Sequence, residues 1–120
     1  MKKKVTRLLI IPAREGSVRI KNKNIKKFNG KPIIKYPLQN AKKSNLFDKI
    51  HVSTSGEKIY NLVKKIGFEP EFKRPKKLSY NNVPVFEVIS FVIKKYLKEN
   101  IFFDEVWLMY PCTPLIKIKD

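Results

Sequence analysis

A continuous apolar run at residues 6–12 constrains the fold of this chain more than any other feature. Four aliphatic side chains in a row follow Arg7, and Pro12 ends the run. A strand with one solvated face alternates apolar and polar residues, whereas a strand inside a parallel sheet is apolar on both faces. The run therefore predicts a central strand of a parallel sheet that is covered by helices on both sides.

Alternating strands and helices are predicted along the rest of the chain. Apolar spacing predicts a helix from Pro32 to Lys43, a second helix that carries Ile59 to Ile66 and is capped by Gly67, and a third from Val85 to Asn100. Further strands are predicted at residues 49–53, 69–73 and 105–110, the last one buried. This order indicates an α/β fold, a Rossmann-like parallel sheet with flanking helices, forming one domain over residues 1–120.

The composition excludes several classes of protein. With 42% apolar residues in 120, the chain can bury one core, so global disorder is excluded. No apolar run approaches the roughly 20 residues that cross a bilayer, and the apolar run after Met1 is too short for a signal peptide, so we expect no membrane association and a cytoplasmic location. The single cysteine, Cys112, excludes an intrachain disulfide and a cysteine-based zinc site.

The strong positive charge has two interpretations. The chain carries 27 Lys and Arg against 10 Asp and Glu, a net charge of +17, which is typical of nucleic-acid-binding modules. However, 23 of the 27 cations are lysines spread along the whole sequence, without a basic stripe interleaved with aromatic residues. A solvated surface set by composition is therefore favoured, and a basic nucleic-acid-binding module remains the alternative.

The loop that follows the first strand has the chemistry of a phosphate site. Ligands of open α/β sheets bind beyond the carboxyl ends of the strands, and residues 13–24 start at such an end. Backbone amides near a glycine and nearby cations can together bind a polyphosphate. The loop matches neither a Walker motif nor a dinucleotide fingerprint. Its candidate residues are Arg14, Gly16, Ser17, Arg19 and Lys23.

Four segments of the sequence resemble the acylneuraminate cytidylyltransferases, which make CMP-activated nonulosonic acids. They are Ile11-Pro12-Ala13-Arg14-x-Gly16-Ser17-x-Arg19-Ile20-x-x-Lys23-Asn24-Ile25 with Asn29 to Ile34, Leu46 to Ile50 with Val52-Ser53-Thr54, Arg74-Pro75-x-x-Leu78, and Tyr110-Pro111-x-Thr113-Pro114-Leu115. The tyrosine of the last motif resembles the pseudaminic acid branch. The resemblance implies the N-terminal, nucleotide-binding half of a nucleotide-diphospho-sugar transferase fold.

The resemblance also implies a CTP site. Arg14 and Lys23 would contact the triphosphate and serve as the catalytic cations. Ser17 and Asn24 would contact phosphate or ribose, within a loop that also contributes Gly16 and Arg19. The other implied contacts are Arg74 near the cytidine and the backbone of Pro12 and Ala13 against the base.

The partners implied by the resemblance are CTP, an acidic sugar, Mg²⁺ and, in the family, a second copy of the chain. Ser55 stands where the family usually has Asp, and Asn81 and Val85 also depart from its pattern. Because relatives extend beyond Asp120 and their metal-binding carboxylates lie there, we expect no metal ligands in this chain, little activity from it alone, and exposed apolar surface. An inactive truncated relative is therefore a further alternative, and the sequence does not identify the acceptor sugar.

Several other residues are expected to be structural. His51 is predicted to be a packed or partly exposed residue of the second strand, and Cys112 to be a buried, inert thiol. Trp107 and the Phe102-Phe103 pair are predicted to lie in the core, and Glu69 and Glu71 to lie on a solvated strand edge.

Overall fold

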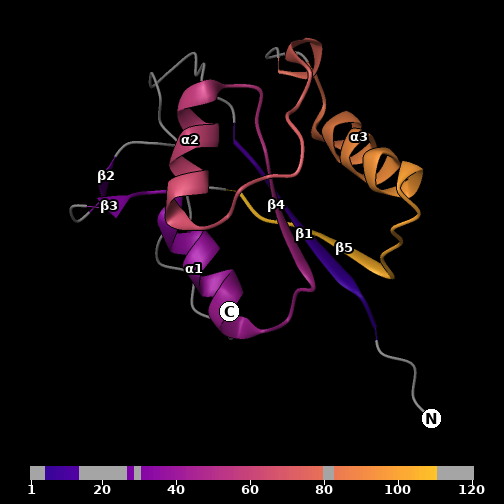
Figure 1. The fold of residues 1–120 in the computed structure, drawn as a ribbon, viewed down its shortest axis with the longest axis horizontal. Coiled ribbons are helices and arrows are strands. Elements are labelled where there is room, and N and C mark those ends of the chain that lie inside the picture. The colour runs from indigo at the N-terminus through magenta and orange to yellow at the C-terminus, as the bar shows by residue number, and fades with distance from the viewer. Residues whose placement is uncertain (1–4, 14–26, 29–30, 80–82, 111–120) are drawn as a thin grey trace.

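The predicted first strand lies at the centre of a parallel three-stranded sheet (Figure 1). The computed structural model describes residues 5–13, 27–28, 31–79 and 83–110. In the described sheet, β1 (Arg7–Pro12) pairs in parallel with β4 (Lys49–Ser53) on one side and with β5 (Glu105–Leu108) on the other. Parallel strands need long crossover connections, and here α1 lies between β1 and β4 in the sequence, while α2 and α3 lie between β4 and β5.

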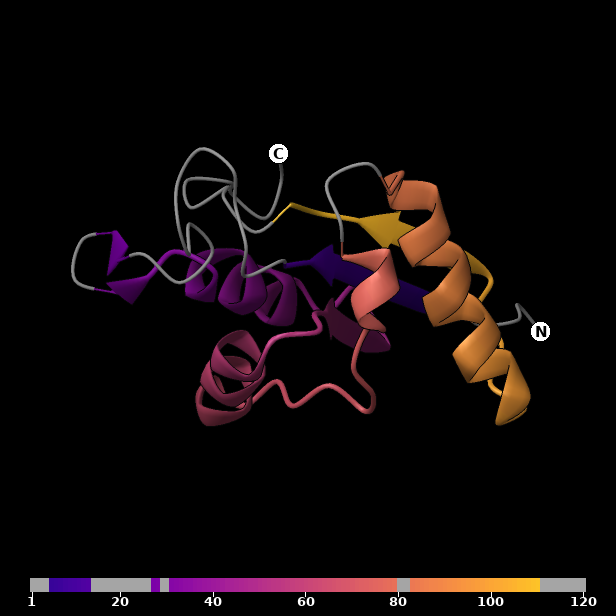
Figure 2. The same cartoon turned by 90° about the horizontal axis from the view of Figure 1, so that it is seen from above.

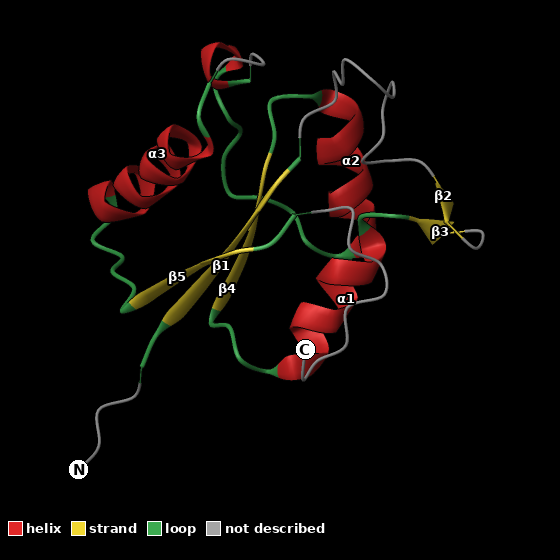
Figure 3. Cartoon of the chain, turned by 180° about the vertical axis from the view of Figure 1, so that it is seen from behind, coloured by secondary structure: helices red, strands yellow, loops and turns green. Residues whose placement is uncertain are grey.

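Helices cover both faces of this sheet, as the sequence predicted. Helices α1 (Lys35–Ser44) and α2 (Glu57–Ile66) lie on one side and α3 (Val85–Lys98) on the other (Figures 2 and 3). Cys112 lies outside the described residues. No helix in the described part of the chain has the length and apolar character needed to span a membrane.

The side chains of β1 divide between two apolar clusters because successive residues of a strand point to opposite faces. Leu9 and Ile11 are buried with residues of α1 and α2, including Leu38 and Ile59. Leu8 and Ile10 are buried on the other face with Val92 and Tyr96 of α3. This two-sided burial confirms the interpretation of the apolar run.

The predicted helices form, and the main difference is at the start of the first. The second helix ends at Gly67, whose φ of 110° suits a residue without a β-carbon. α1 begins at Lys35 and not at Pro32, because Pro32 belongs to a short antiparallel pair of β2 (Lys27–Phe28) and β3 (Lys31–Pro32). The sequence Asn29-Gly30 between the two strands is a common hairpin signal, from which this pair of strands could have been predicted.

The prediction of a strand at residues 69–73 is wrong. This segment instead contacts β4 through side chains: Glu71 pairs with Lys49, and the Phe72 ring lies 4.4 Å from the His51 ring. After it come Arg74 and the 3₁₀ turn η2 (Lys76–Leu78). Its polar and apolar residues alternate as in a strand, but residues 69–73 do not form the backbone hydrogen bonds of a sheet with β4. Glu69 is solvent-exposed, as expected, and accepts a hydrogen bond from Tyr60 at 3.0 Å.

The prediction that residues 105–110 form a buried strand is also wrong in part. β5 forms but is an edge strand of the described sheet, and its Trp107 is 46% exposed. Phe102 is 68% exposed and is not a core residue, whereas Phe103 packs against Tyr96 with 5.4 Å between ring centroids. An edge strand has one neighbour only, so its apolar side chains lack cover on the outer side. The expected exposed apolar surface therefore lies along β5.

Candidate functional site at the carboxyl edge of the sheet

The carboxyl ends of the three strands bring distant parts of the chain to one edge of the sheet. Pro12, the last residue of β1, is in register with Ser53, the last residue of β4. The amide of Ala13 donates a hydrogen bond of 2.9 Å to the carbonyl of Ser53, and the amide of Met109 donates one of 3.1 Å to the carbonyl of Ile10. Parallel strands place ligand sites at this edge.

Arg74 lies in the connection that follows α2 and forms hydrogen bonds with the same edge of the sheet. Its Nε donates to the hydroxyl of Ser53 at 3.0 Å, and a terminal nitrogen donates to the carbonyl of Ser53 at 2.8 Å. Its amide donates to the carbonyl of Thr54 at 2.7 Å. The residue is only 6% exposed, so a guanidinium charge is buried beside the ends of β1 and β4.

The structure therefore brings together three of the residues that the sequence assigned to the site. Ser53 contacts all three of them: Pro12, Ala13 and Arg74. Ser53 belongs to a motif of the family resemblance, but no role was predicted for it. The motif Val-Ser-Thr at a strand end was the signal in the sequence that could have pointed to Ser53. Its contact with Arg74, 21 positions away in the sequence, is visible only in the structure. Six predicted site residues lie outside the described part of the chain: Arg14, Gly16, Ser17, Arg19, Lys23 and Asn24.

Hydroxyl groups extend this edge beyond β4. The Ser79 hydroxyl donates to the Ser55 hydroxyl at 2.9 Å, and the amide of Gly56 donates to the Thr54 hydroxyl at 3.2 Å. Within the described ranges, no group of three or more His, Cys, Asp or Glu side chains is placed to hold a metal ion. The described residues at this edge thus offer a buried cation, backbone groups and hydroxyls, which suit a polar, anionic ligand.

His51 and Tyr96 form a buried pair behind the edge. The Tyr96 hydroxyl lies 3.4 Å from Nδ1 of His51, and both residues are about 1% exposed. Burial, with smaller effects of the charges on Lys49 and Arg74, lowers the pKa of His51 from 6.5 to about 4. Burial, with a smaller effect of Glu99, raises the pKa of Tyr96 to about 12. Both groups are therefore uncharged at neutral pH. His51 is a structural residue of the strand, as predicted, and of the two predicted states, packed or partly exposed, it is the packed one.

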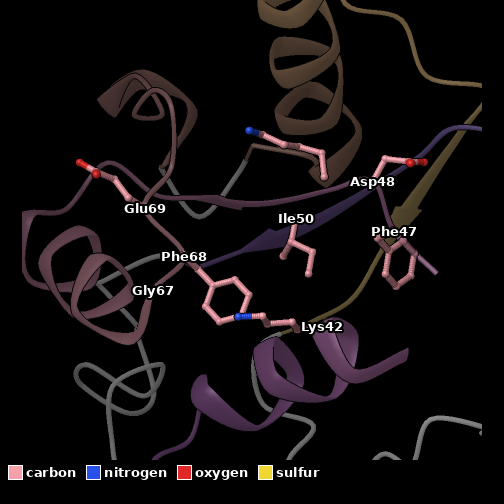
Figure 4. A pocket seen from close by; sticks show the side chains of 8 residues that line it. Lys42, Phe47, Asp48, Ile50, Gly67, Phe68 and Glu69 are labelled. Carbon is pink, nitrogen blue, oxygen red and sulfur yellow. The ribbon is translucent and has the colours of Figure 1, made fainter. Parts of the chain in front are cut away.

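A separate pocket of about 290 Å³ lies toward the opposite end of the sheet (Figure 4). It is formed where the carboxyl ends of α1 and α2 approach the start of β4. Its charged groups already have partners: Lys42 lies over the Phe68 ring, Lys49 pairs with Glu71, and Glu69 accepts from Tyr60. This pocket is distinct from the edge that gathers Ala13, Ser53 and Arg74. Its lining residues are Lys42, Phe47, Asp48, Lys49, Ile50, Gly67, Phe68 and Glu69.

Comparison with known sequences identifies similar proteins. The cytidylyltransferase family model matches residues 8–100. The chain is 38% identical over 109 residues to the pseudaminic acid cytidylyltransferase of Campylobacter jejuni, covering 91% of this chain and 47% of that protein. It is 31% identical over 110 residues to the CMP-N,N'-diacetyllegionaminic acid synthase of Legionella pneumophila, covering 92% and 47%. The chain spans about half the length of the curated relatives it matches.

Comparison with solved structures agrees on the fold. A CMP:2-keto-3-deoxy-manno-octonic acid synthetase complexed with CTP superposes with a TM-score of 0.80 at 19% identity, covering 95% of this chain and 43% of that one. A cytidylyltransferase from Leptospira borgpetersenii superposes with a TM-score of 0.70 at 23% identity, covering 97% and 45%. The predicted resemblance and the nucleotide-diphospho-sugar transferase type of fold are both confirmed.

Proposed function

Because this chain belongs to the cytidylyltransferase family, we propose that it binds CTP at the carboxyl edge of its sheet and supplies the nucleotide-binding half of a CMP-sugar synthetase. In the proposed reaction, a hydroxyl oxygen of an acidic sugar attacks the α-phosphorus of CTP. A new bond forms between this oxygen and the α-phosphorus, the bond from the α-phosphorus to the pyrophosphate oxygen breaks, and the hydroxyl proton passes to solvent. The activity is assigned to an enzyme of the relatives' full length, because this chain spans about half of it.

A single observation carries the proposal. The carbonyl of Ser53 accepts hydrogen bonds both from the amide of Ala13 and from the guanidinium of Arg74. The family resemblance assigns the first of these residues to the face of the base and the second to the vicinity of the cytidine. Residues 61 positions apart in the sequence thus meet at the sheet edge where an α/β fold binds its ligands.

The loop after β1 is proposed to bind the triphosphate. Ala13 is buried directly after β1, at the carboxyl edge of the sheet, and Arg14 is the next residue in the sequence. In the proposal, Arg14 and Lys23 neutralise the phosphates and stabilise the charge that develops on them during transfer. The remaining proposed contacts come from the loop residues Gly16, Ser17, Arg19 and Asn24, with the backbone of Pro12 and Ala13 against the base.

The partners of the whole enzyme follow from its relatives and remain part of the proposal. A pseudaminic acid cytidylyltransferase is 38% identical to this chain, which favours an acidic nonulosonic sugar as acceptor. Mg²⁺ would neutralise the triphosphate, but the described residues do not form a site for it, so its ligands would be mainly the phosphates of CTP. A chain with one cysteine needs no oxidising compartment, which favours the cytoplasm. No dimer interface is proposed.

Binding measurements test this function against the nucleic-acid alternative. CTP, other nucleoside triphosphates and duplex DNA are titrated into the protein at two salt concentrations, with Arg14→Ala and Lys23→Ala as variants. We expect CTP binding, weakened about tenfold or more by each variant, since a hydrogen bond to a charged group contributes about 1.5–3 kcal/mol. Tight DNA binding that falls steeply with salt, without a response to nucleotides, would instead identify a nucleic-acid-binding module.

A further inference from the structure

We propose that Arg74 is a positioning residue that acts through Ser53 and holds the backbone of Ala13 in place for the nucleotide. This inference rests on the proposed function for its consequence in binding, but its structural part concerns the protein without ligand. It differs from the role that family resemblance gives to Arg74, which is a place beside the cytidine.

Two hydrogen bonds of the Arg74 guanidinium support this role because both are directed at Ser53, the last residue of β4. Two donors of its planar guanidinium bind the hydroxyl and the carbonyl of the same residue, Ser53, at 3.0 and 2.8 Å. A guanidinium offers its donors in a fixed fork, so two simultaneous contacts define the position and orientation of their acceptor residue. The ammonium of a lysine could not reproduce this geometry.

The shared carbonyl carries the effect of Arg74 to β1. The carbonyl oxygen of Ser53 accepts from Arg74 at 2.8 Å and from the amide of Ala13 at 2.9 Å. Ala13 is the first residue after β1 and is fully buried. If Ser53 shifts, the hydrogen-bond partner of the Ala13 amide shifts with it. Because a backbone group has no side-chain rotamer with which to compensate, such a shift would change any contact that this backbone makes with a base.

The segment that carries Arg74 is also held in place by contacts that do not involve the guanidinium. The Phe72 ring packs on His51, Lys73 pairs with Glu57 at the start of α2, and the amide of Arg74 donates to Thr54 at 2.7 Å. These contacts remain when the guanidinium is changed. A substitution of Arg74 is therefore expected to disturb the end of β4 without releasing the whole segment.

The test combines amide hydrogen exchange with a double-mutant cycle. The proteins are the wild type, Arg74→Lys, Ser53→Ala and the double variant. We expect the amide of Ala13 to exchange at least about tenfold faster in Arg74→Lys, because its acceptor is no longer held, while amides at the start of β1 keep their rates. Arg7→Lys is the matched control, since Arg7 donates to Glu105 at 2.8 Å at the opposite end of β1.

For CTP binding we expect non-additive effects. Arg74→Lys should weaken binding about tenfold and Ser53→Ala a few-fold, while the double variant should resemble Arg74→Lys alone, because the Ser53 hydroxyl has already lost its donor. Additive losses, or an unchanged exchange rate of the Ala13 amide in Arg74→Lys, would overturn the inference. A wild type that does not bind CTP would refute the proposed function instead, and Ala13 exchange would still decide whether Arg74 positions this backbone.

Discussion

Lowering the pH should destabilise this protein through His51. The folded protein holds the pKa of this buried ring at about 4, whereas in the unfolded chain it returns to its ordinary value of 6.5. Between these two values the unfolded state binds more protons, so the free energy of unfolding falls as the pH falls. The groups that face the ring are Tyr96 from α3, Lys49 on β4 and Arg74 from the connection after α2. None of them offers a negative charge at neutral pH that would stabilise a protonated ring.

The size of the effect follows from the two pKa values. Relative to pH 7.5, linkage gives a loss of about 2 kcal/mol at about pH 5 and about 3 kcal/mol at about pH 4, since one pKa unit corresponds to about 1.4 kcal/mol. Well above pH 6.5, at about pH 7.5, the ring is almost entirely neutral in both states and the contribution is nearly fully present. Because carboxylates also titrate below pH 5, the effect is isolated by comparison with His51→Gln, a variant that keeps a polar partner for Tyr96 and does not titrate.

Two assays check this prediction. Urea denaturation of the wild type and of His51→Gln is measured from pH 7.5 to pH 4.5, and the gap between their pH profiles should match the calculated loss. His51 is the only histidine in the chain, so its ring resonance can be followed by NMR without assignment of others. A titration midpoint near 6.5 in the folded protein, or identical pH profiles of the two proteins, would refute the reasoning.

Three further substitutions test the core, a helix end and the exposed edge strand. Ile59→Ala on the buried face of α2 should lower the free energy of unfolding by about 2–5 kcal/mol through a cavity, while Lys58→Ala on the same helix should change it little; denaturant unfolding measures both. Gly67→Ala should cost about 1–2 kcal/mol in the same assay, because a β-carbon there meets no atom within 4 Å and only the left-handed backbone is strained. We expect the exposed apolar side chains of β5 to cause self-association, so Trp107→Lys on β5 should reduce self-association in sedimentation velocity without unfolding the protein. Equal association of the variant and the wild type would contradict this expectation.

Elements with a strong local signal could be predicted from the amino-acid sequence. The apolar run in β1 leaves no polar face, so a strand buried on both sides was the consistent interpretation, and the structure buries Leu8 to Ile11 completely or nearly so. The spacing of Ile59, Val63 and their neighbours, followed by Gly67, similarly identified α2 and its end. The motifs around Ala13 and Arg74 identified the family, because they combine residue types that chance spacing seldom reproduces.

The neighbours of each element could not be predicted in this way, because they depend on how distant segments of the chain fold together. Residues 69–73 had the composition of a strand with a solvated edge, and residues 105–110 had that of a buried strand. Whether a strand forms a hydrogen-bonded ladder, and whether helices cover it, depends on neighbours that come from distant parts of the chain. Residues 71 and 72 contact β4 through their side chains in the pairs Glu71–Lys49 and Phe72–His51, and β5 is an edge strand of the described sheet. Ala13 and Arg74 both donate a hydrogen bond to the carbonyl of Ser53. This arrangement depends on the register of β1 with β4, which pairs Pro12 with Ser53 at the ends of the two strands. Composition and periodicity report on one segment at a time, whereas a shared carbonyl requires three segments to meet.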